Sequence, residues 1–465
     1  MVRNRLFPFT GLIVAVVCLV SAAALAQLSD DEDKPVDQDT GESTLKERTL
    51  GLLPNSLERW GVKFAATYIT DALVNTTGGV RPGAGLEGRL NLAVDIDFGK
   101  AGGAKGLSFH GNVFAIHGDQ FTERNLQSFM AASGIEGLTT VRLFEAWFEQ
   151  KMLNDRFSLR AGQMSADAEF IATKFSDVFT NATFTWPASN ATNLPSGGPA
   201  TPLAAIGARL RAKLTENITG MIAVYDGDPA GPGDGNPQQR NRYGLNFRLN
   251  DPPLVLGQID IDWSDKLGKN TPGVLKVGGF RHFGDFRSVR FASDGLTLAD
   301  PTSNGMSATF RGDSGVFAVI EQKVAAKAND ENRGIGFFAR AVISPPDRNT
   351  IDIYADAGFQ ASGWFDARPN DKFGIAVAYA HVSNAAQALD RDFQLFQGPR
   401  FPVRSFEALA TAAYAYEIRS GWMLQPNAQL LARPGGGASD PTKSDIPRRR
   451  LGTALVLGLR SLVKF

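Results

Sequence analysis

The chain has 465 residues with 48 basic and 48 acidic side chains, so its formal net charge is zero. That balance argues against a nucleic-acid-binding protein, which normally carries a basic excess. A mean hydropathy of −0.14 and a single apolar run, at the N-terminus, exclude a bundle of membrane-spanning helices. One cysteine, Cys18, excludes a disulfide framework and a cysteine-based zinc site. We expect neither a metal nor a cofactor.

The N-terminus has the pattern of an export signal. Arg3 and Arg5 precede an apolar stretch over residues 11–25, and Ala24-Leu25-Ala26 supplies a small-residue cleavage site. The pattern predicts a signal peptide over residues 1–26. Residues 27–57 are acidic and polar, and we expect them to form a flexible segment in the periplasm.

The rest of the chain alternates apolar and polar residues with a period of two. The alternation is clearest over residues 89–98, 206–214 and 351–360. It predicts strands with one face in an apolar medium, either the core of a soluble β-protein or the lipid around a transmembrane barrel.

Three features favour the barrel. The predicted strands have about 9–13 residues, long enough to cross a hydrocarbon layer at a tilt. Helical periodicity is almost absent, except around residues 125–132. The chain ends in a strand whose last residue is Phe465, which is typical of bacterial outer-membrane barrels and predicts recognition by the barrel-assembly machinery. A closed sheet leaves no unpaired backbone edge in lipid.

Seventeen segments show strand patterning: 61–75, 86–98, 106–117, 141–151, 157–164, 205–214, 218–226, 242–250, 254–263, 274–283, 316–324, 334–343, 351–360, 372–382, 405–417, 421–431 and 452–465. Single-chain bacterial barrels have an even number of strands with both termini in the periplasm. Short turns such as 215–217 and long loops such as 165–204 and 383–404 should lie at opposite ends of the barrel. Assigning them from the two ends of the chain gives conflicting results only across residues 242–263. Assigning 242–250 to an extracellular loop removes the conflict. The sequence therefore predicts an all-β fold, a 16-stranded antiparallel transmembrane β-barrel over residues 58–465.

Several segments of the predicted barrel together match a known pattern. The segments are Arg142–Gln150 (RLFEAWFEQ), Ser158–Gln163 (SLRAGQ), Gly336–Arg340 (GFFAR), Ser344–Asn349 (SPPDRN), Arg368–Asp371 (RPND), Trp422–Gln429 (WMLQPNAQ), Arg433–Gly436 (RPGG) and Ala454–Arg460 (ALVLGLR). With them the chain resembles the carbohydrate-selective porins of the OprB family over about residues 58–465. The resemblance implies an outer-membrane channel that passes mono- or small oligosaccharides and polyols by diffusion, as a homotrimer or a monomer. Its implied partners are carbohydrate solutes and outer-membrane lipid, and no nucleic acid.

A pore that prefers sugars needs aromatic platforms and polar side chains in its lumen. In residues 141–151, strict alternation turns Phe144, Ala146 and Phe148 toward lipid and Trp147 inward between two carboxylates. Trp147 either contacts sugar or packs against an infolded loop, and the basic residues either contact solute or pair with carboxylates of neighbouring strands. The predicted lumen residues are Arg89, Arg142, Glu145, Trp147, Glu149, Arg160, Arg209, Arg211 and Lys213.

The long loop over residues 165–204 is placed to fold inward and narrow the channel. Phe184, Trp186 and Asn190 are its candidate constriction residues.

Enzyme-like patterns have simpler explanations. Residues 83–88 match G-x-G-x-x-G, but a strand and not a helix follows them. Residues 312–315 read Gly-Asp-Ser-Gly without a supporting histidine context. Carboxylates two residues apart, as in Asp95 and Asp97, arise wherever one strand face is polar. We therefore expect no enzyme. A general or anion-preferring porin, motivated by Arg209, Arg211 and Lys213, stays open, as do a barrel hydrolase and a secreted soluble β-protein.

Overall fold

The computed structural model describes residues 48–465 except 264–270, 328–329 and 444–448, and these described residues all belong to one unit, Gly41–Phe465. The predicted signal peptide with Cys18, and residues 27–47 of the predicted acidic segment, lie outside the described residues. Residues 48–57 are irregular and lead into the short turn η1 (Glu58–Trp60). Within the described ranges, no helix combines the length and the apolar character needed to span a membrane.

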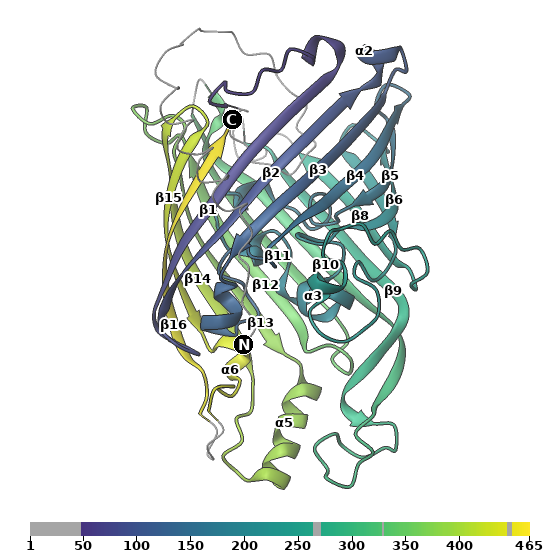
Figure 1. Ribbon diagram of the computed structural model, residues 1–465, viewed down its shortest axis with the longest axis vertical. Coiled ribbons are helices and arrows are strands. Elements are labelled where there is room, and N and C mark those ends of the chain that lie inside the picture. Colours follow the sequence, from purple (N-terminus) through teal and green to yellow (C-terminus); the bar gives the residue numbers. More distant parts are fainter. Residues whose placement is uncertain (1–47, 264–270, 328–329, 444–448) are drawn as a thin grey trace, which may run out of the picture. The chain divides into compact units, whose positions relative to one another are not determined.

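The described part of the chain contains sixteen antiparallel strands that form one closed barrel, in which each strand pairs with its neighbours in sequence (Figure 1). Both the predicted number and the loop assignment of residues 242–250 are confirmed. The strands are β1 (Val62–Gly79), β2 (Gly83–Asp97), β3 (Leu107–Gly118), β4 (Thr140–Met152), β5 (Phe157–Met164), β6 (Ala205–Lys213), β7 (Ile218–Tyr225), β8 (Leu254–Trp263), β9 (Gly273–Ala292), β10 (Ser307–Lys327), β11 (Asp330–Ile343), β12 (Ile351–Ser362), β13 (Lys372–Val382), β14 (Phe406–Arg419), β15 (Trp422–Ala432) and β16 (Gly452–Lys464).

The first and last strands join to complete the wall. β1 pairs with β16 in a register that places Asp71 opposite Arg460. The backbone N–H of Phe465 then donates to the carbonyl of Ala66 at 3.0 Å. This seam leaves neither terminal strand with an open edge, as a sheet in lipid requires.

The outer face of the wall is apolar. In β13, Phe373, Ile375, Val377 and Tyr379 are exposed, whereas the residues between them are buried. Exposed Leu, Ile, Val and Phe side chains recur at alternate positions on most other strands. A soluble β-protein would bury these rows, so the pattern fits a wall surrounded by lipid.

Short turns and long loops alternate between the two ends of the barrel. Residues 214–217 join β6 to β7 at one end, which we call the short-turn end, and residues 165–204 join β5 to β6 at the other, the long-loop end. β9 and β10 are longer than the predicted segments 274–283 and 316–324 and continue beyond the start of β8 at the long-loop end.

One helix was not predicted. Residues 383–404 were expected to form a loop, but α5 (Asn384–Gln397) begins behind Ser383, whose hydroxyl accepts a hydrogen bond from the Ala386 N–H as an N-cap. The helical periodicity at residues 125–132 is largely not matched by a helix: the π-helical turn η2 (Thr122–Leu126) includes only residues 125 and 126 of it, and residues 127–132 are irregular. The other helices are short: α2 (Phe98–Gly102), η3 (Lys174–Ser176), η4 (Ala182–Phe184), α3 (Ala188–Asn193), η5 (Pro195–Gly197), α4 (Pro237–Arg240) and α6 (Pro434–Gly437).

Candidate functional site

The loop over residues 165–204 folds against the inner face of the barrel wall. Its carbonyls accept hydrogen bonds from inward side chains of widely separated strands: Lys276 of β9 donates to Ala172, Arg340 of β11 to Ile171, and Gln425 of β15 to Val178. A segment bonded to β9, β11 and β15 lies across the lumen. We call residues 165–204 the long infolded segment.

A second segment, residues 119–139, also lies inside the wall, and the sequence did not reveal it. Glu87 of β2 accepts hydrogen bonds from the backbone N–H groups of Asp119 and Phe121. On the other side of the β1–β16 seam, Glu407 of β14 accepts from the N–H groups of Phe129 and Met130. We call residues 119–139 the short infolded segment. Its one sequence signal is a set of apolar residues too rich for an exposed loop, Phe121, Leu126, Met130 and Ile135, all of which are buried.

The predicted constriction residues are inside the long infolded segment. Phe184 is buried and packs against Phe179 and, edge to face, against Phe338 of β11. Trp186 is buried and donates its indole N–H to the carbonyl of Gly197 at 3.1 Å. Asn190 is buried and accepts a hydrogen bond from Ser189. These three side chains fill space within the long infolded segment and stabilise its conformation.

Four of the charged groups on and beside the predicted lumen strands form one ion network. Arg209 of β6 lies 3.0 Å from Glu149 of β4 and 2.5 Å from Glu169 of the long infolded segment. Arg160 of β5 lies 3.2 Å from Glu149 and 3.6 Å from Glu169. The side chains are at most 9% exposed. Two cations thus neutralise two carboxylates, and the network bonds the infolded segment to the wall. Glu169 was not among the predicted residues, because no local pattern distinguishes it from other loop carboxylates.

Trp147 is covered on both faces. The Arg160 guanidinium carbon lies 3.7 Å from the centroid of its ring, and His110 of β3 stacks on it with a centroid separation of 5.0 Å. His110 also bonds Asp95 of β2, with 2.7 Å between Nδ1 and Oδ1. Trp147 is 6% exposed, so it presents no open ring face to the lumen in this structure.

A β-bulge alters the predicted register of β4. Leu143 pairs with Val113 and Glu145 with Asn112, so Phe144 is the extra residue. The prediction that Phe144 faces lipid is wrong: it is buried and stacks on Phe114, with ring centroids 4.5 Å apart. The bulge also explains how Arg142 and Glu145, three residues apart, both point inward.

Arg142 and Glu145 contact loops at the long-loop end. Arg142 is buried and donates to the carbonyls of Pro202 and Gln238. Glu145 accepts from both the N–H and the hydroxyl of Ser165, the first residue of the long infolded segment. Both residues position loops.

The remaining predicted lumen residues, Arg89, Arg211 and Lys213, do not join the ion network of Arg160, Arg209, Glu149 and Glu169. The Arg89 guanidinium lies over the ring of Phe114, 4.4 Å from its centroid. Arg211 interacts electrostatically with Asp260 of β8. Lys213 is exposed at the short-turn end of β6.

Two carboxyl groups of the infolded segments, Asp167 and Glu136, have raised pKa values. Burial raises the pKa of Asp167, against the hydrogen bond that it accepts from the Thr201 N–H at 2.9 Å. Burial and the nearby carboxylate Glu87 raise the pKa of Glu136 to about 8, although Thr122 donates to it from both its N–H and its hydroxyl. A raised pKa means that the folded segment favours the protonated acid.

Several other inward charges of the described wall are also paired. Examples are Arg340–Asp356, Arg460–Asp71, Lys276–Glu321 and Lys372–Asp177. In the described ranges no three His, Cys, Asp or Glu side chains are placed to hold a metal ion. The lumen is thus polar, and the paired charges compensate one another locally, an environment that can hydrogen-bond a passing solute.

Comparisons with known proteins identify the family. The family "Carbohydrate-selective porin, OprB family" matches residues 81–465. Porin B of Pseudomonas aeruginosa is 23% identical over 407 residues, covering 81% of this chain and 84% of that protein. The putative porin QuiX of Acinetobacter baylyi is 21% identical over 402 residues, covering 82% and 86%.

Among solved structures, the high-pH structure of Pseudomonas putida OprB superimposes with a TM-score of 0.76 at 20% identity, covering 88% of this chain and 96% of that one. This likeness supports the sixteen-stranded barrel. Since the family match takes in most of the sequence, the chain belongs to the OprB family of carbohydrate-selective porins and is an outer-membrane channel, not an enzyme.

Proposed function

We propose that the barrel passes neutral mono- and small oligosaccharides and polyols into the periplasm by passive diffusion, through a lumen narrowed by the two infolded segments. The observation that carries the proposal is the pairing of inward charges, of which Arg209 between Glu149 and Glu169 is the clearest case. A sugar is uncharged and rich in hydroxyls. A wall of paired ions offers it hydrogen bonds without a strong field of one sign that would favour an ion.

The solute path includes polar groups that stay accessible. One row crosses β2 to β4 from Asp95, whose side chain is 53% exposed, through His110 to Glu145. Arg89 lies on the same strand as Asp95. Solute hydroxyls exchange weak hydrogen bonds with these groups as they pass, which permits both entry and exit.

The buried residues of the predicted site have a positioning role. Arg142, Glu149, Arg160 and Arg209 hold loops against the wall, and Trp147 is packed between Arg160 and His110. Phe184, Trp186 and Asn190 set the bulk of the constriction from within the long infolded segment. We expect these residues to fix the size of the passage, and only indirectly the choice of solute.

An anion-preferring channel is less well supported. Arg209, one of its three motivating residues, is neutralised by two carboxylates, Arg211 interacts with Asp260, and Lys213 lies at the short-turn end. No cluster of unbalanced cations arises from these three.

The proposed partners and topology follow from the fold class. We propose that residues 1–26 direct export, that the short-turn end faces the periplasm, and that the assembly machinery recognises the final strand through Phe465.

Liposome swelling tests the function. Proteoliposomes receive neutral hexoses and pentoses, and in parallel gluconate and glucosamine of similar size. We expect the neutral sugars to enter severalfold faster than either charged solute. Faster entry of gluconate than of glucose, with an ion current in planar bilayers that sugars do not block, would instead establish the anion-preferring channel.

A further inference from the structure

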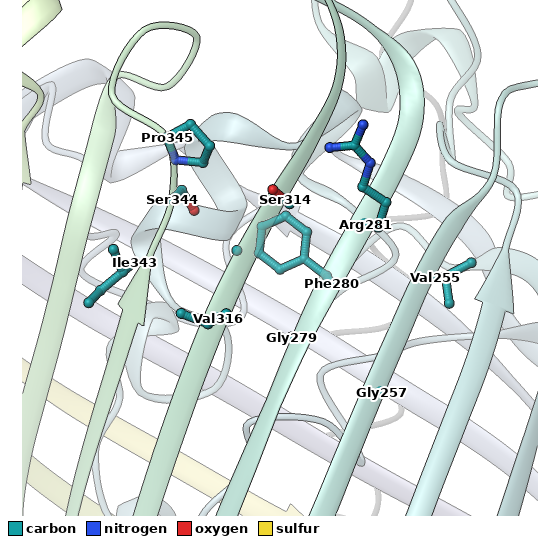
Figure 2. A pocket seen from close by; sticks show the side chains of 11 residues that line it. Val255, Gly257, Gly279, Phe280, Arg281, Ser314, Val316, Ile343, Ser344 and Pro345 are labelled. Carbon is teal, nitrogen blue, oxygen red and sulfur yellow. The ribbon is translucent and has the colours of Figure 1, made fainter.

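The lipid-facing wall contains a groove across β7 to β10. One hollow of about 610 Å³ lies among β8, β9, β10 and β11, and a second of about 440 Å³ lies among β6, β7, β8 and β9. Gly257 lines both, so the two form one groove. Figure 2 shows the larger hollow. Exposed aliphatic side chains such as Val316, Ile343 and Ile222 form its banks.

The groove exists because outward positions on neighbouring strands have no side chain. Gly257 of β8 and Gly279 of β9 are direct register partners, and Gly220 of β7 lies opposite Ile259, two residues along β8. A Cβ at Gly279 would meet the Gly315 carbonyl oxygen at 2.8 Å, so packing explains that glycine. A Cβ at Gly257 would meet nothing within 4 Å. Glycine weakens a strand, and the described fold gives no packing reason for it here.

A cation lies at the long-loop end of the groove. Arg281 lines the larger hollow, two residues beyond Gly279 on the same face of β9, and its side chain is visible there in Figure 2. In the described part of the chain its guanidinium forms no ion pair; it donates one long hydrogen bond, 3.4 Å, to the Arg311 carbonyl.

The position of Arg281 matches the boundary between hydrocarbon and headgroups. On the outward face of β9, Leu275, Val277 and Gly279 precede it, and Phe283 and the charged Asp285 and Arg287 follow. Cations and aromatic residues collect at this depth of a bilayer, where anionic headgroups lie.

We propose that the groove binds one anionic membrane lipid, with its phosphate at Arg281 and an acyl chain along Gly279, Gly257 and Gly220. The occupant is anionic because the polar end of the groove is a cation, Arg281, with no carboxylate partner among the described residues. It is a lipid because the rest of the groove is apolar and faces the bilayer.

Native mass spectrometry of the full, folded barrel in detergent tests the site, with dioleoylphosphatidylglycerol and dioleoylphosphatidylcholine as probes. We expect one phosphatidylglycerol to stay bound under activation that removes phosphatidylcholine. Arg281→Gln should lower phosphatidylglycerol occupancy about fivefold, the effect of one cation near a membrane surface. Gly257→Leu, whose side chain enters open space, should lower it by at least as much, with Gly257→Ala as the milder variant.

Two matched variants serve as controls. Arg287→Gln removes an outward charge from the same strand, about 20 Å beyond Arg281 at 3.3 Å per residue. Ala410→Leu enlarges an exposed residue on β14, distant from the groove in strand order. Both should keep occupancy within about twofold of the wild type, and heat-modifiable mobility should show that every variant is folded.

Equal retention of the two lipids, or equal losses in Arg281→Gln and Arg287→Gln, would show that only bulk lipid fills the groove. An unchanged occupancy in Gly257→Leu would overturn the assignment of the acyl chain.

Discussion

Arg340 and Asp356 form an ion pair between β11 and β12 in which both side chains are fully buried, with 2.5 Å between Nη2 and Oδ2. The same guanidinium donates to the carbonyls of Ile171 and Thr183, and Tyr354 donates its hydroxyl to Asp356. One side chain thus bonds the wall to two points of the long infolded segment. Its charge is fully compensated, which makes it a structural anchor.

Arg340→Gln should release the long infolded segment and leave Asp356 buried without its cation. Breaking one side of a buried pair costs about 3–5 kcal/mol. We expect a lower unfolding temperature, followed by heat-modifiable mobility, and a larger, noisier single-channel conductance. Arg333→Gln is the control, because its partner Asp366 is 79% exposed, and it should change neither quantity. A quiet channel of wild-type conductance in Arg340→Gln would show that this anchor does not hold the constriction.

Deleting Phe184–Asn190 should widen the passage. These residues fill space inside the barrel, where Phe184 packs on Phe338 of the wall. We expect single-channel conductance to rise about twofold and liposome swelling to admit larger oligosaccharides. A deletion of equal length in the loop between β9 and β10, residues 300–306, which contains no buried residue, should leave both unchanged. If the two deletions behave alike, the long infolded segment does not limit flow.

The short infolded segment depends on one carboxylate of β14. Glu407 accepts hydrogen bonds from the N–H groups of Phe129, Met130 and Gly435 at 2.7–2.9 Å. Glu407→Gln places an amide NH₂ among these donors and should lower the local stability of this segment by about 2 kcal/mol. We expect faster hydrogen exchange at residues 128–131. The exposed Glu123 provides the control, as Glu123→Gln should leave these exchange rates unchanged.

Stability should depend on pH through Glu136. Its pKa rises from the ordinary 4.5 to about 8 on folding, so the folded state holds a proton that the unfolded state loses within this window. The contribution of Glu136 to the free energy of unfolding is therefore greatest below pH 4.5, and it falls as the pH rises toward 8. Glu136→Gln removes that loss and should be more stable than the wild type by about 1–3 kcal/mol at pH 8.5, with little difference at pH 4.5.

Unfolding temperatures of both proteins across pH 4.5–8.5 measure this difference, with Glu123→Gln as the variant that follows the wild type. A wild type that remains as stable as Glu136→Gln at pH 8.5 would contradict the proton-linked account.

The sequence predicted the wall well because the alternation of a strand is local. The limits of β5, β8 and β13 agree with the predicted segments to within one residue. The bulge at Phe144 was not predictable, since it depends on the packing of that ring against Phe114 on the adjacent strand. One extra residue was enough to change the direction of its side chain relative to strict alternation.

The interior was less predictable because its contacts are distant in sequence. Glu169 meets Arg209 forty residues later, and Glu407 meets Phe129 after 278 residues. Neither the composition of the chain nor the residue spacing within one strand can predict such pairs. The helix α5 was missed for a different reason: its Ser383 cap is a local signal, but the surrounding residues were interpreted only as a loop.

The seam between β1 and β16 has a consequence for assembly. Asp71 and Arg460, which form two hydrogen bonds across it, are 389 residues apart, so its contact order is among the highest that this chain allows. Contacts of such separation form late. Until they form, the unpaired edges of β1 and β16 and the apolar outer face can pair with or bind other chains. We therefore expect the chain to need a chaperone until its insertion is complete. Removing the Arg460 side chain should therefore reduce the yield of assembled barrel more than it changes the conductance of barrels that have assembled.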